Sequence, residues 1–465
     1  MSKHPYDLLV VGSGGAAMSA AITARQAGRT VLLVEAKTLG GTCVNAGCVP
    51  SKALLRFAAH RAEAAANPFV GAPTSAGPVE LGALIGQKDE LVGRLRSGKY
   101  AAVADAYGFE VRPAAAAFAD DGTLAIDGRP LEATNYLLAA GAEPARPDLP
   151  GLDRVDYLTS TTAMELLELP DSLVVIGGGY VGMEQAQLFA GLGVRVTLVG
   201  RLAPNAEPEL REVMRTAFGR EGIRVVEHRA LAVEAAGNGD GAASQVTVVT
   251  DTGLRVAAGR LLLAAGRTPR TAGLNLPAAG VKTDQRGFIV VDAQQRTTNP
   301  RVFAAGDVTG GPQYVYVAAA QGRVAALNAF GASDAVDYAG LPAVMFTRPQ
   351  LASAGLSEEQ ALAAGYDCEC RTLSLADVPR ALVNFDTLGA VKLIADGASG
   401  RLLGVHAAAE GAGELMLAAT YAIRARMTVR DMADTWAPYL TMAESLRLAA
   451  KLFAPGERLP TSCCA

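Results

Sequence analysis

Two cysteine pairs have the residue type and spacing best suited to redox or metal chemistry. Cys43 and Cys48 lie five positions apart in GTCVNAGCVP, and Cys463 and Cys464 are neighbours in the terminal TSCCA. Two thiols can exchange electrons with a disulfide, or their thiolates can bind a soft metal ion. The chain has only four histidines in 465 residues, so few imidazoles are available to move protons. Either chemistry requires elements that hold the thiols beside an electron source.

The composition indicates a folded protein with several domains. Half of the residues are hydrophobic and 19% are charged, which is enough apolar material for a large core and argues against disorder. The formal net charge is −4 and no basic run occurs, so we expect no nucleic-acid partner. The N-terminal apolar run is short and broken by glycines, which predicts a cytoplasmic protein without a membrane span. In that compartment the cysteines are expected to be catalytic, metal-binding or incidental rather than a disulfide framework.

The sequence contains the same βαβ pattern twice, over residues 6–36 and 172–201. In each copy an apolar strand runs into a glycine-rich turn, a helix and a second strand, which is the pattern of a Rossmann-like dinucleotide site. The helix N-terminus in such a unit binds the pyrophosphate. The small residues that the turn requires are Gly12, Gly14 and Ala17 in the first copy and Gly177, Gly179 and Gly182 in the second.

The end of the second strand predicts a different nucleotide for each copy. Glu35 follows Gly12 by 23 residues, whereas the position 23 residues after Gly177 is Gly200, followed by Arg201. A carboxylate accepts hydrogen bonds from ribose hydroxyls and repels a 2′-phosphate, and an arginine has the opposite preference. We therefore predict FAD in the first unit and NADPH in the second. The alternative for Arg201 is a solvated surface charge.

The segment GGTCVNAGCVPSK resembles the active-site segment of the flavin-dependent pyridine nucleotide-disulfide oxidoreductases. The resemblance extends to both nucleotide units, to LLLAAGRTP at 261–269 and to the C-terminal part. It implies that Cys48 is the thiolate beside the flavin and that Cys43 is the outer thiol, which meets the substrate. A position that opens a helix would lower the pKa of such a thiol.

The same resemblance implies further residues around the flavin. Lys52 matches the family lysine near the flavin and is expected to pair with Glu184, and Asp307 is expected at the flavin after a late strand. Four more FAD contacts follow from alignment with the family alone: Lys37, Thr42, Ala116 and Val315.

The implied fold is α/β and glutathione-reductase-like, with two Rossmann-like nucleotide-binding domains and a C-terminal α/β dimerisation domain. The C-terminal part has no phosphate loop and is expected to form the interface of a homodimer. The expected boundaries are 1–150 for the first part of the FAD domain, 151–270 for the NADPH domain, 271–339 for the second part of the FAD domain, and 340–465 for the dimerisation domain with its Cys-Cys tail.

The C-terminal sequence argues against a disulfide substrate. Disulfide-reducing members of the family carry a proton-shuttling histidine in a His-Pro-Thr segment, and the equivalent stretch here is PYLTMAE, with Tyr439 at that position. Tyrosine has a pKa of about 10 and imidazole one of about 6.5, so tyrosine is the poorer proton shuttle at neutral pH. The histidines of the chain lie elsewhere: His4, His60, His228 and His406.

TSCCA and TWAPYLTMAESLRLAAKLF resemble the branch of this family that reduces mercuric ion. That resemblance implies that Cys463 and Cys464 of the partner subunit capture Hg(II) and pass it to Cys43 and Cys48. It also implies that two tyrosines, Tyr180 and Tyr439, line the metal and nicotinamide pocket. In the predicted cycle NADPH reduces FAD, and Hg(II) on the inner thiols receives two electrons and leaves as Hg(0).

Two other functions stay open at this point. A thioredoxin-reductase-like disulfide reductase also ends in neighbouring cysteines, but its chemistry uses the histidine that is missing here. A metal-sequestering flavoprotein would bind the ion without oxidising NADPH, which two intact nucleotide units argue against. Cys368 and Cys370 in DCECR form a C-x-C motif that either binds metal or is incidental.

Overall fold

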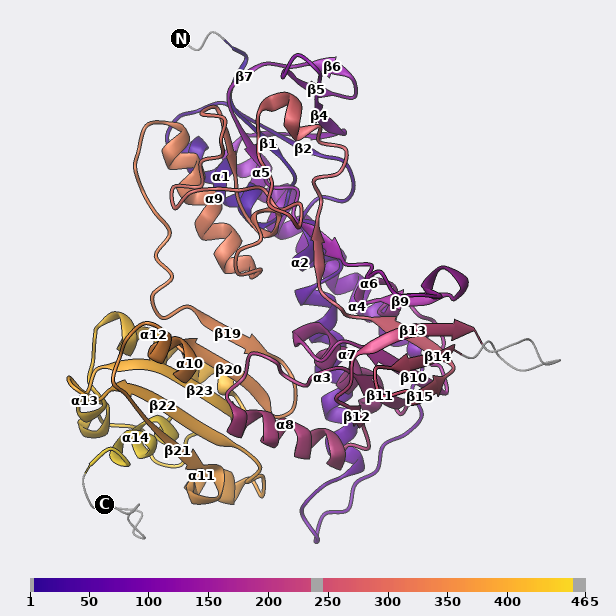
Figure 1. Cartoon of the computed structure of the whole chain (residues 1–465), viewed down its shortest axis with the longest axis vertical. Coiled ribbons are helices and arrows are strands. Elements are labelled where there is room, and N and C mark those ends of the chain that lie inside the picture. Colours follow the sequence, from indigo (N-terminus) through magenta and orange to yellow (C-terminus); the bar gives the residue numbers. More distant parts are fainter. Residues whose placement is uncertain (1–3, 236–245, 455–465) are drawn as a thin grey trace, which may run out of the picture.

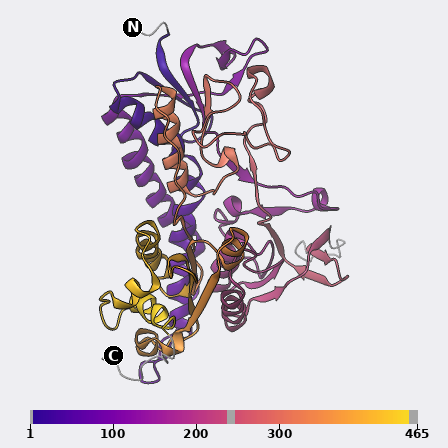
Figure 2. The same ribbon diagram turned by 60° about the vertical axis from the view of Figure 1, so that its left-hand side comes forward.

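Three large sheets with their helices form an elongated molecule (Figures 1 and 2). The computed structural model describes residues 4–235 and 246–454. Figure 1 shows the first nucleotide unit at the top, the second at the right and the C-terminal layer at the lower left.

The first glycine-rich unit folds as a strand, a tight turn, a helix and a second strand. Its elements are β1 (Tyr6–Val11), α1 (Gly15–Gln26) and β2 (Val31–Glu35). Gly12 has a φ of +107°, and an added Cβ atom would overlap the carbonyl oxygen of Ala139. Any residue with a side chain would be strained at this φ and would overlap Ala139, so this turn requires glycine.

A parallel sheet with the strand order β18-β7-β1-β2-β3 surrounds this unit. Its other strands are β3 (Glu110–Pro113), β7 (Ala133–Leu138) and β18 (Val302–Ala304). Because β18 joins this sheet, the late segment with Asp307 lies at the first nucleotide unit. Helix α9 (Val315–Ala329) then packs beside α1, so closely that a Cβ atom at Gly322 would overlap the carbonyl oxygen of Ala16 (Figure 1).

The second unit forms its own parallel sheet, with the strand order β12-β11-β10-β16-β9. Its strands are β9 (Tyr157–Thr159), β10 (Ser172–Ile176), β11 (Arg195–Val199), β12 (Arg224–Val226) and β16 (Arg260–Leu263). Its helices are α7 (Tyr180–Gly191) and α8 (Pro208–Arg220). A small antiparallel sheet packs on it, made of β13 (Ala230–Ala235), β14 (Val246–Thr250) and β15 (Arg255–Ala258).

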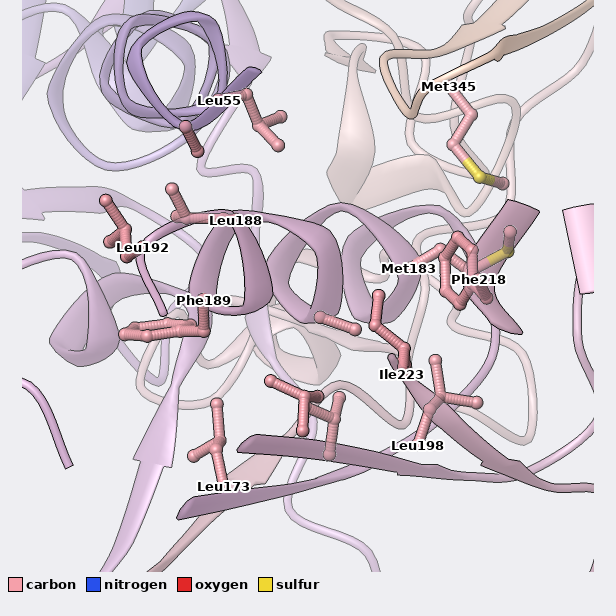
Figure 3. Close-up of a cluster of buried hydrophobic side chains, with 14 of the residues drawn as sticks. Leu55, Leu173, Met183, Leu188, Phe189, Leu192, Leu198, Phe218, Ile223 and Met345 are labelled. Atoms are coloured by element: carbon pink, nitrogen blue, oxygen red, sulfur yellow. The ribbon is translucent and has the colours of Figure 1, made fainter. Parts of the chain in front are cut away.

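The cysteines of the first motif lie on two helices that leave the first unit: Cys43 on the short α2 (Gly41–Asn45) and Cys48 on the long α3 (Cys48–Ala65). Helix α4 (Leu81–Arg96) follows them in the chain. One core joins α3 to the second unit: Leu55 packs above Leu188 of α7, while Leu173 and Leu198 contribute from the sheet below the helix (Figure 3). Burial of these side chains stabilises the contact between α3 and α7, so the thiol helix has a fixed position relative to the second nucleotide unit.

The C-terminal layer is an antiparallel sheet with the strand order β19-β20-β23-β22-β21. Its strands are β19 (Pro342–Met345), β20 (Gln350–Gly355), β21 (Cys368–Ser374), β22 (Ala390–Asp396) and β23 (Leu402–Ala409). Its helices are α10 (Glu358–Ala363), α11 (Pro379–Val383), α12 (Ala412–Arg424), α13 (Val429–Asp434) and α14 (Glu444–Lys451).

Short elements complete the chain. They are α5 (Ala102–Tyr107), α6 (Ser160–Ala163), β4 (Ala116–Phe118), β5 (Leu124–Ile126), β6 (Arg129–Pro130), β8 (Ala142–Pro144) and β17 (Arg267–Pro269). In the part of the chain that the structure describes, no helix is both long and apolar enough to cross a membrane. The α/β architecture agrees with the sequence expectation, and the domain boundaries stay a prediction.

Candidate active site

The two thiols of the first motif meet where α2 ends and α3 begins. Cys43 lies within α2, and Cys48 is the first residue of α3, preceded by the non-helical Gly47. Both cysteines are free thiols, and the thiol of Cys43 donates a hydrogen bond to the sulfur of Cys48. Cys48 is exposed, whereas Cys43 is half-buried.

The environment gives the two thiols opposite acidities. The hydrogen bond from Cys43 lowers the pKa of Cys48 to about 7, and the positive charge of Lys52 acts in the same direction, while partial desolvation of the sulfur by the surrounding protein opposes both. The same hydrogen bond, together with burial, raises the pKa of Cys43. Above a pH of about 7 the pair therefore holds mainly a thiolate on Cys48, while Cys43 keeps its proton.

This difference predicts a pH dependence for alkylation of Cys48. Its rate of reaction with iodoacetamide should rise with pH, with a midpoint near pH 7, and should fall as the thiolate gains a proton below that pH. Mass spectrometry of the Cys48 peptide measures the rate separately from the other cysteines. The variant Cys43→Ala removes the hydrogen-bond donor, so its midpoint should move to higher pH. A native midpoint near the unperturbed cysteine value of about 8.5 would contradict the proposed charge state.

An ion pair joins the thiol helix to the second nucleotide unit. The Nζ atom of Lys52 lies 2.7 Å from Oε2 of Glu184, the partner that the sequence predicts. Oε1 of Glu184 accepts a hydrogen bond of 2.9 Å from the backbone N–H of Phe346, and the Lys52 ammonium lies 4.9 Å from the centre of the Phe346 ring. Glu184 is only 8% exposed, so the loss of Lys52 would leave a buried carboxylate without this cation.

The first glycine turn has the geometry that a dinucleotide requires. Gly14 caps α1, and Gly41 approaches it so closely, with a φ of +66°, that a Cβ atom on Gly41 would contact the Cα of Gly14. Glu35 ends β2, and its carboxylate accepts hydrogen bonds from Ser13 Oγ at 2.5 Å and from the backbone N–H of Lys37 at 2.8 Å. A turn without side chains at the N-terminus of a helix fits the pyrophosphate of such a cofactor, and the Glu35 carboxylate at the end of the next strand fits its ribose.

The second glycine turn repeats this geometry. Gly177 has a φ of +117°, open space lies in front of Gly179, and a Cβ atom on Gly182 would overlap the carbonyl oxygen of Gly177. Arg201 follows β11 beside this turn, with its backbone carbonyl against Gly178 and its side chain exposed. The turn fits a second dinucleotide, with a cation available where a 2′-phosphate would lie.

Asp307 opens a short 3-10 turn (Asp307–Thr309) after β18 and faces a residue that the sequence analysis did not single out. Oδ2 of Asp307 lies 3.5 Å from Nε of Arg267, and Nη2 of Arg267 donates to the carbonyl oxygen of Ala142 at 2.6 Å. Burial raises the pKa of Asp307 and lowers that of Arg267, and the attraction between the two charges opposes both shifts.

The four residues that alignment alone assigned to FAD occupy different places. Val315 opens α9, and its Cγ2 atom would lie 3.0 Å from a Cβ atom on Gly15, so it borders the first glycine turn. Thr42 lies in α2 directly before Cys43, and Lys37 follows β2 and binds Glu35 through its backbone. Ala116 is half-buried in β4 of the small β4-β5-β6 sheet.

The structure places the two predicted tyrosines in different surroundings. Tyr180 opens α7 and meets Tyr314 edge to face at 6.3 Å, and Tyr314 stacks on Tyr316 with the ring centres 5.3 Å apart. Burial raises the pKa of Tyr180, which therefore keeps its proton. Tyr439 is 51% exposed between α13 and α14, and Figure 1 shows these helices well separated from α2 along the long axis. Within one chain, Tyr439 is thus not grouped with the thiol pair.

The other residues singled out in the sequence are Ala17, the four histidines and the two tail cysteines. Ala17 is fully buried in α1. His406 is buried in β23, with its Nε2 atom 2.9 Å from the carbonyl oxygen of Leu356, and burial lowers its pKa. The other histidines each face an acidic residue: His4 faces Glu132, His60 faces Glu63, and His228 faces Asp251. Cys463 and Cys464 lie outside the described residues.

Sequence reasoning missed several residues that support the site. They are Gly41, Ser13, Arg267, Phe346, Tyr314 and Tyr316. The Gly-Gly pair before Thr42 was a signal for a close backbone approach, and the arginine in AGRTP was a signal for a partner to an acidic residue. The contacts of Phe346 and of the tyrosines depend on packing between distant segments and have no local signal.

Family models match nearly the whole chain. Residues 6–322 match the pyridine nucleotide-disulphide oxidoreductase family, and residues 341–450 match the dimerisation domain of the same family. The chain is 51% identical to the mercuric reductase of Streptomyces lividans over 99% of this chain and 98% of that protein. It is 43% identical to the mercuric reductase of Staphylococcus aureus, covering 99% of this chain and 84% of the relative.

Solved structures show the same fold. The HOCl-induced flavoprotein disulfide reductase RclA of Escherichia coli, as its Cu(II) complex, superimposes with a TM-score of 0.85 at 28% identity, covering 96% of this chain and 100% of that chain. LpdA of Mycobacterium tuberculosis superimposes with a TM-score of 0.83 at 27% identity, covering 96% and 99%. The predicted glutathione-reductase-like fold and the predicted family are both confirmed. The chain is an oxidoreductase that belongs to the pyridine nucleotide-disulphide oxidoreductase family, whose members use a flavin and a pyridine nucleotide.

Proposed function

We propose that this oxidoreductase reduces Hg(II) to Hg(0) with electrons from NADPH, through FAD and the Cys43–Cys48 pair. The observation that carries the proposal is this pair of free thiols, in which the pKa of Cys48 is lowered and that of Cys43 is raised, in a chain 51% identical to a mercuric reductase over nearly its full length. Soft thiolates are the ligands that a thiophilic cation prefers.

The two glycine turns support the assignment of cofactors. The first unit would hold FAD, because the Glu35 carboxylate accepts hydrogen bonds and is placed to do so from ribose hydroxyls. The second would hold NADPH, because no acid ends β11 and Arg201 can pair with a 2′-phosphate. When bound, the two cofactors supply the two electrons that Hg(II) requires.

The thiol pair accounts for capture of the metal. Cys43, the outer thiol, exchanges first with thiol-bound Hg(II), and its proton leaves with one carrier thiol. The Cys48 thiolate then displaces the second carrier as a thiolate and forms the second sulfur–mercury bond. Arrival of two electrons at mercury breaks both bonds and returns the two protein sulfurs as thiolates. No S–S bond is broken, so the substrate requires no proton-shuttling histidine, which agrees with Tyr439 at that position.

Neighbouring side chains would hold this pair in place. The Lys52 ammonium, fixed by Glu184 and the ring of Phe346, stabilises the Cys48 thiolate. Tyr180 opens the helix behind the second glycine turn as a neutral phenol, which suits it to cover the nicotinamide without adding charge.

A homodimer is expected from the dimerisation domain. The C-terminal layer exposes large apolar side chains, with Trp436 at 97%, Phe385 at 67% and Tyr421 at 65%. Exposed aromatic side chains in such number are typical of a protein interface. We propose that the dimer brings Tyr439, Cys463 and Cys464 of one subunit to the Cys43–Cys48 pair of the other.

If the tail cysteines deliver Hg(II), their loss should lower activity mainly when other thiols compete for the ion. Cys463→Ala/Cys464→Ala should lower turnover about tenfold when excess glutathione competes for Hg(II), because the tethered thiols raise the local concentration of the ion. With Hg(II) supplied without competing thiol, the loss should be smaller. Steady-state NADPH oxidation under both conditions gives the comparison. Equal turnover of variant and native enzyme in excess thiol would remove the tail from the mechanism.

The choice of substrate tests the function itself. NADPH oxidation should be measured in excess thiol with Hg(II), with oxidised glutathione and with thioredoxin as alternative acceptors. We expect turnover with Hg(II) and little with either disulfide. Activity with a disulfide but not with Hg(II) would favour a disulfide reductase, and Hg(II) binding without NADPH oxidation would favour a metal-sequestering flavoprotein.

A further inference from the structure

The C-x-C motif lies on the edge strand of the C-terminal sheet, in a different layer from the Cys43–Cys48 pair. Cys368 and Cys370 belong to β21, which within the described part of the chain pairs only with β22. Residues two apart on a strand share a face. The two Sγ atoms lie 3.4 Å apart, and both thiols are free and half-buried. The pair is therefore preorganised and can be reached from solvent at the edge of the sheet.

An apolar cluster lies on one side of the two thiols, and a group of charged side chains lies on another. Cys368 and Cys370 pack against a small apolar cluster, which contains Ala361, Ile394 and Leu403. Beside the cluster, the ammonium of the buried Lys392 binds three carboxylates. They belong to Glu207 just before α8 at 2.8 Å, Glu209 in α8 at 3.1 Å, and Glu358 in α10 at 2.7 Å. Three carboxylates against one ammonium leave a net negative charge, which favours a cation at the sulfurs.

The backbone geometry distinguishes metal binding from a disulfide. On an extended strand, parallel side chains two residues apart are separated by about 6.6 Å at their bases. A disulfide requires a Cβ–Cβ distance of about 3.5–4.5 Å, so it would distort the strand. A linear S–metal–S unit with bonds of about 2.3 Å spans about 4.6 Å, which the two side chains reach by opening slightly from 3.4 Å.

The acidity of the pair also separates it from the catalytic thiols. Burial, followed by the hydrogen bond with Cys368, raises the pKa of Cys370 to about 12. At neutral pH this thiol stays protonated and is a poor nucleophile for disulfide exchange. A thiophilic cation can still displace its proton, because metal–sulfur bonds replace S–H bonds.

We propose that Cys368 and Cys370 form a second, non-catalytic site that binds a soft cation such as Hg(II) or Ag(I) between two sulfurs. Two S–H bonds are exchanged for two sulfur–metal bonds, and two protons pass to solvent. No redox change occurs at this site, so the ion is retained rather than reduced. In the described ranges 4–235 and 246–454, no cluster of three or more histidine, cysteine or acidic side chains could hold a metal, so this pair favours ions that accept two ligands. The site does not depend on the proposed catalytic function.

The full chain allows a clean test, because it has only six cysteines. The variant Cys43→Ser/Cys48→Ser/Cys463→Ser/Cys464→Ser leaves Cys368 and Cys370 as the only thiols, and bound flavin reports that it is folded. HgCl2 is added with excess glutathione and no NADPH, the protein is desalted, and retained mercury is measured by mass spectrometry. We expect one mercury per chain and loss of both titratable thiols, with the absorption band of mercury thiolates.

A further Cys368→Ser or Cys370→Ser change in this variant should lower retained mercury by about tenfold, because the second sulfur supplies the chelate. In the otherwise native chain, Cys368→Ser/Cys370→Ser should lower retained mercury by one equivalent and leave Hg(II)-dependent turnover unchanged. Absence of retained mercury in the two-cysteine variant, or retention that survives loss of either sulfur, would overturn the proposal. Half an equivalent per chain would also overturn it, because that ratio means a bridge between two chains.

Discussion

Cys43→Ser or Cys48→Ser is expected to lower Hg(II)-dependent NADPH oxidation by about 1000-fold or more, because each variant removes one of two sulfurs that act as a unit. Serine oxygen is a hard ligand with a weak affinity for mercury, and it does not ionise near neutral pH. In the Cys43 variant the serine hydroxyl can still donate a hydrogen bond to Cys48, so the loss reports on the missing sulfur ligand and not on the pKa of Cys48.

Two controls separate this loss from damage to the fold. Each variant should retain flavin and should still pass electrons from NADPH to an artificial acceptor that takes them directly from the flavin. Cys370→Ser is the matched cysteine control, since Cys370 lies in the C-terminal sheet and should leave turnover unchanged. Turnover with Hg(II) within tenfold of the native rate in the Cys48→Ser enzyme would refute the role of the pair.

Gly182→Val should weaken NADPH binding strongly and leave flavin binding intact. A Cβ atom at position 182 would overlap the carbonyl oxygen of Gly177, so valine must displace either the glycine turn or the start of α7. We expect KM for NADPH to rise by about 100-fold or more, which corresponds to about 2.7 kcal/mol of lost binding. The first nucleotide unit is a separate sheet, so flavin fluorescence and content should stay native.

Gly219→Ala is the matched control for this variant. Gly219 lies within α8 of the same unit, and an added Cβ atom meets nothing within 4 Å. Because alanine favours the helix over glycine, this change should keep KM and stabilise the protein slightly. An unchanged KM in Gly182→Val, or an equal effect of both substitutions, would show that the second turn is not the NADPH site.

Local patterns in the sequence were sufficient to predict the nucleotide units. The glycine turns at Gly12 and Gly177 require a positive φ beside a neighbouring strand, and such a requirement leaves a short motif. Glu35 ends β2, 23 residues after Gly12, and Arg201 lies just beyond β11, 24 residues after Gly177, so the chemistry of the two strand ends could be compared directly. The resemblance of the thiol segment then supplied the family.

Contacts between distant segments could not be predicted in the same way. The partners of Glu184 are Lys52 and the backbone of Phe346, which are 132 and 162 residues away, and only the first was expected, from family resemblance. Arg267 meets Asp307 because β17 and the end of β18 lie close together in the fold, and the sequence of neither segment indicates that they do so. Tyr180 at the start of α7 meets Tyr314, which lies just before α9 and 134 residues away in the sequence, and Tyr314 in turn stacks on Tyr316.

The placement of Tyr439 favours a site to which two subunits contribute. The residue is exposed on the C-terminal layer, well separated from α2, and the two tail cysteines follow beyond the described residues. Sequence comparison can align this tyrosine with a histidine that acts across an interface, but it cannot provide the interface. The exposed aromatic side chains of the same layer are the physical feature that favours a second subunit there.

The ratio of mercury vapour released to NADPH oxidised tests the central claim most directly. Purified enzyme with bound flavin should be given thiol-bound Hg(II) and a limiting amount of NADPH, with Hg(0) purged from solution and quantified while absorbance at the nicotinamide band is followed. Two-electron transfer to mercury on the Cys43–Cys48 pair predicts one Hg(0) for each NADPH and no vapour from the Cys43→Ser enzyme. Oxidation of NADPH without release of Hg(0), or equal release by that variant, would contradict the account.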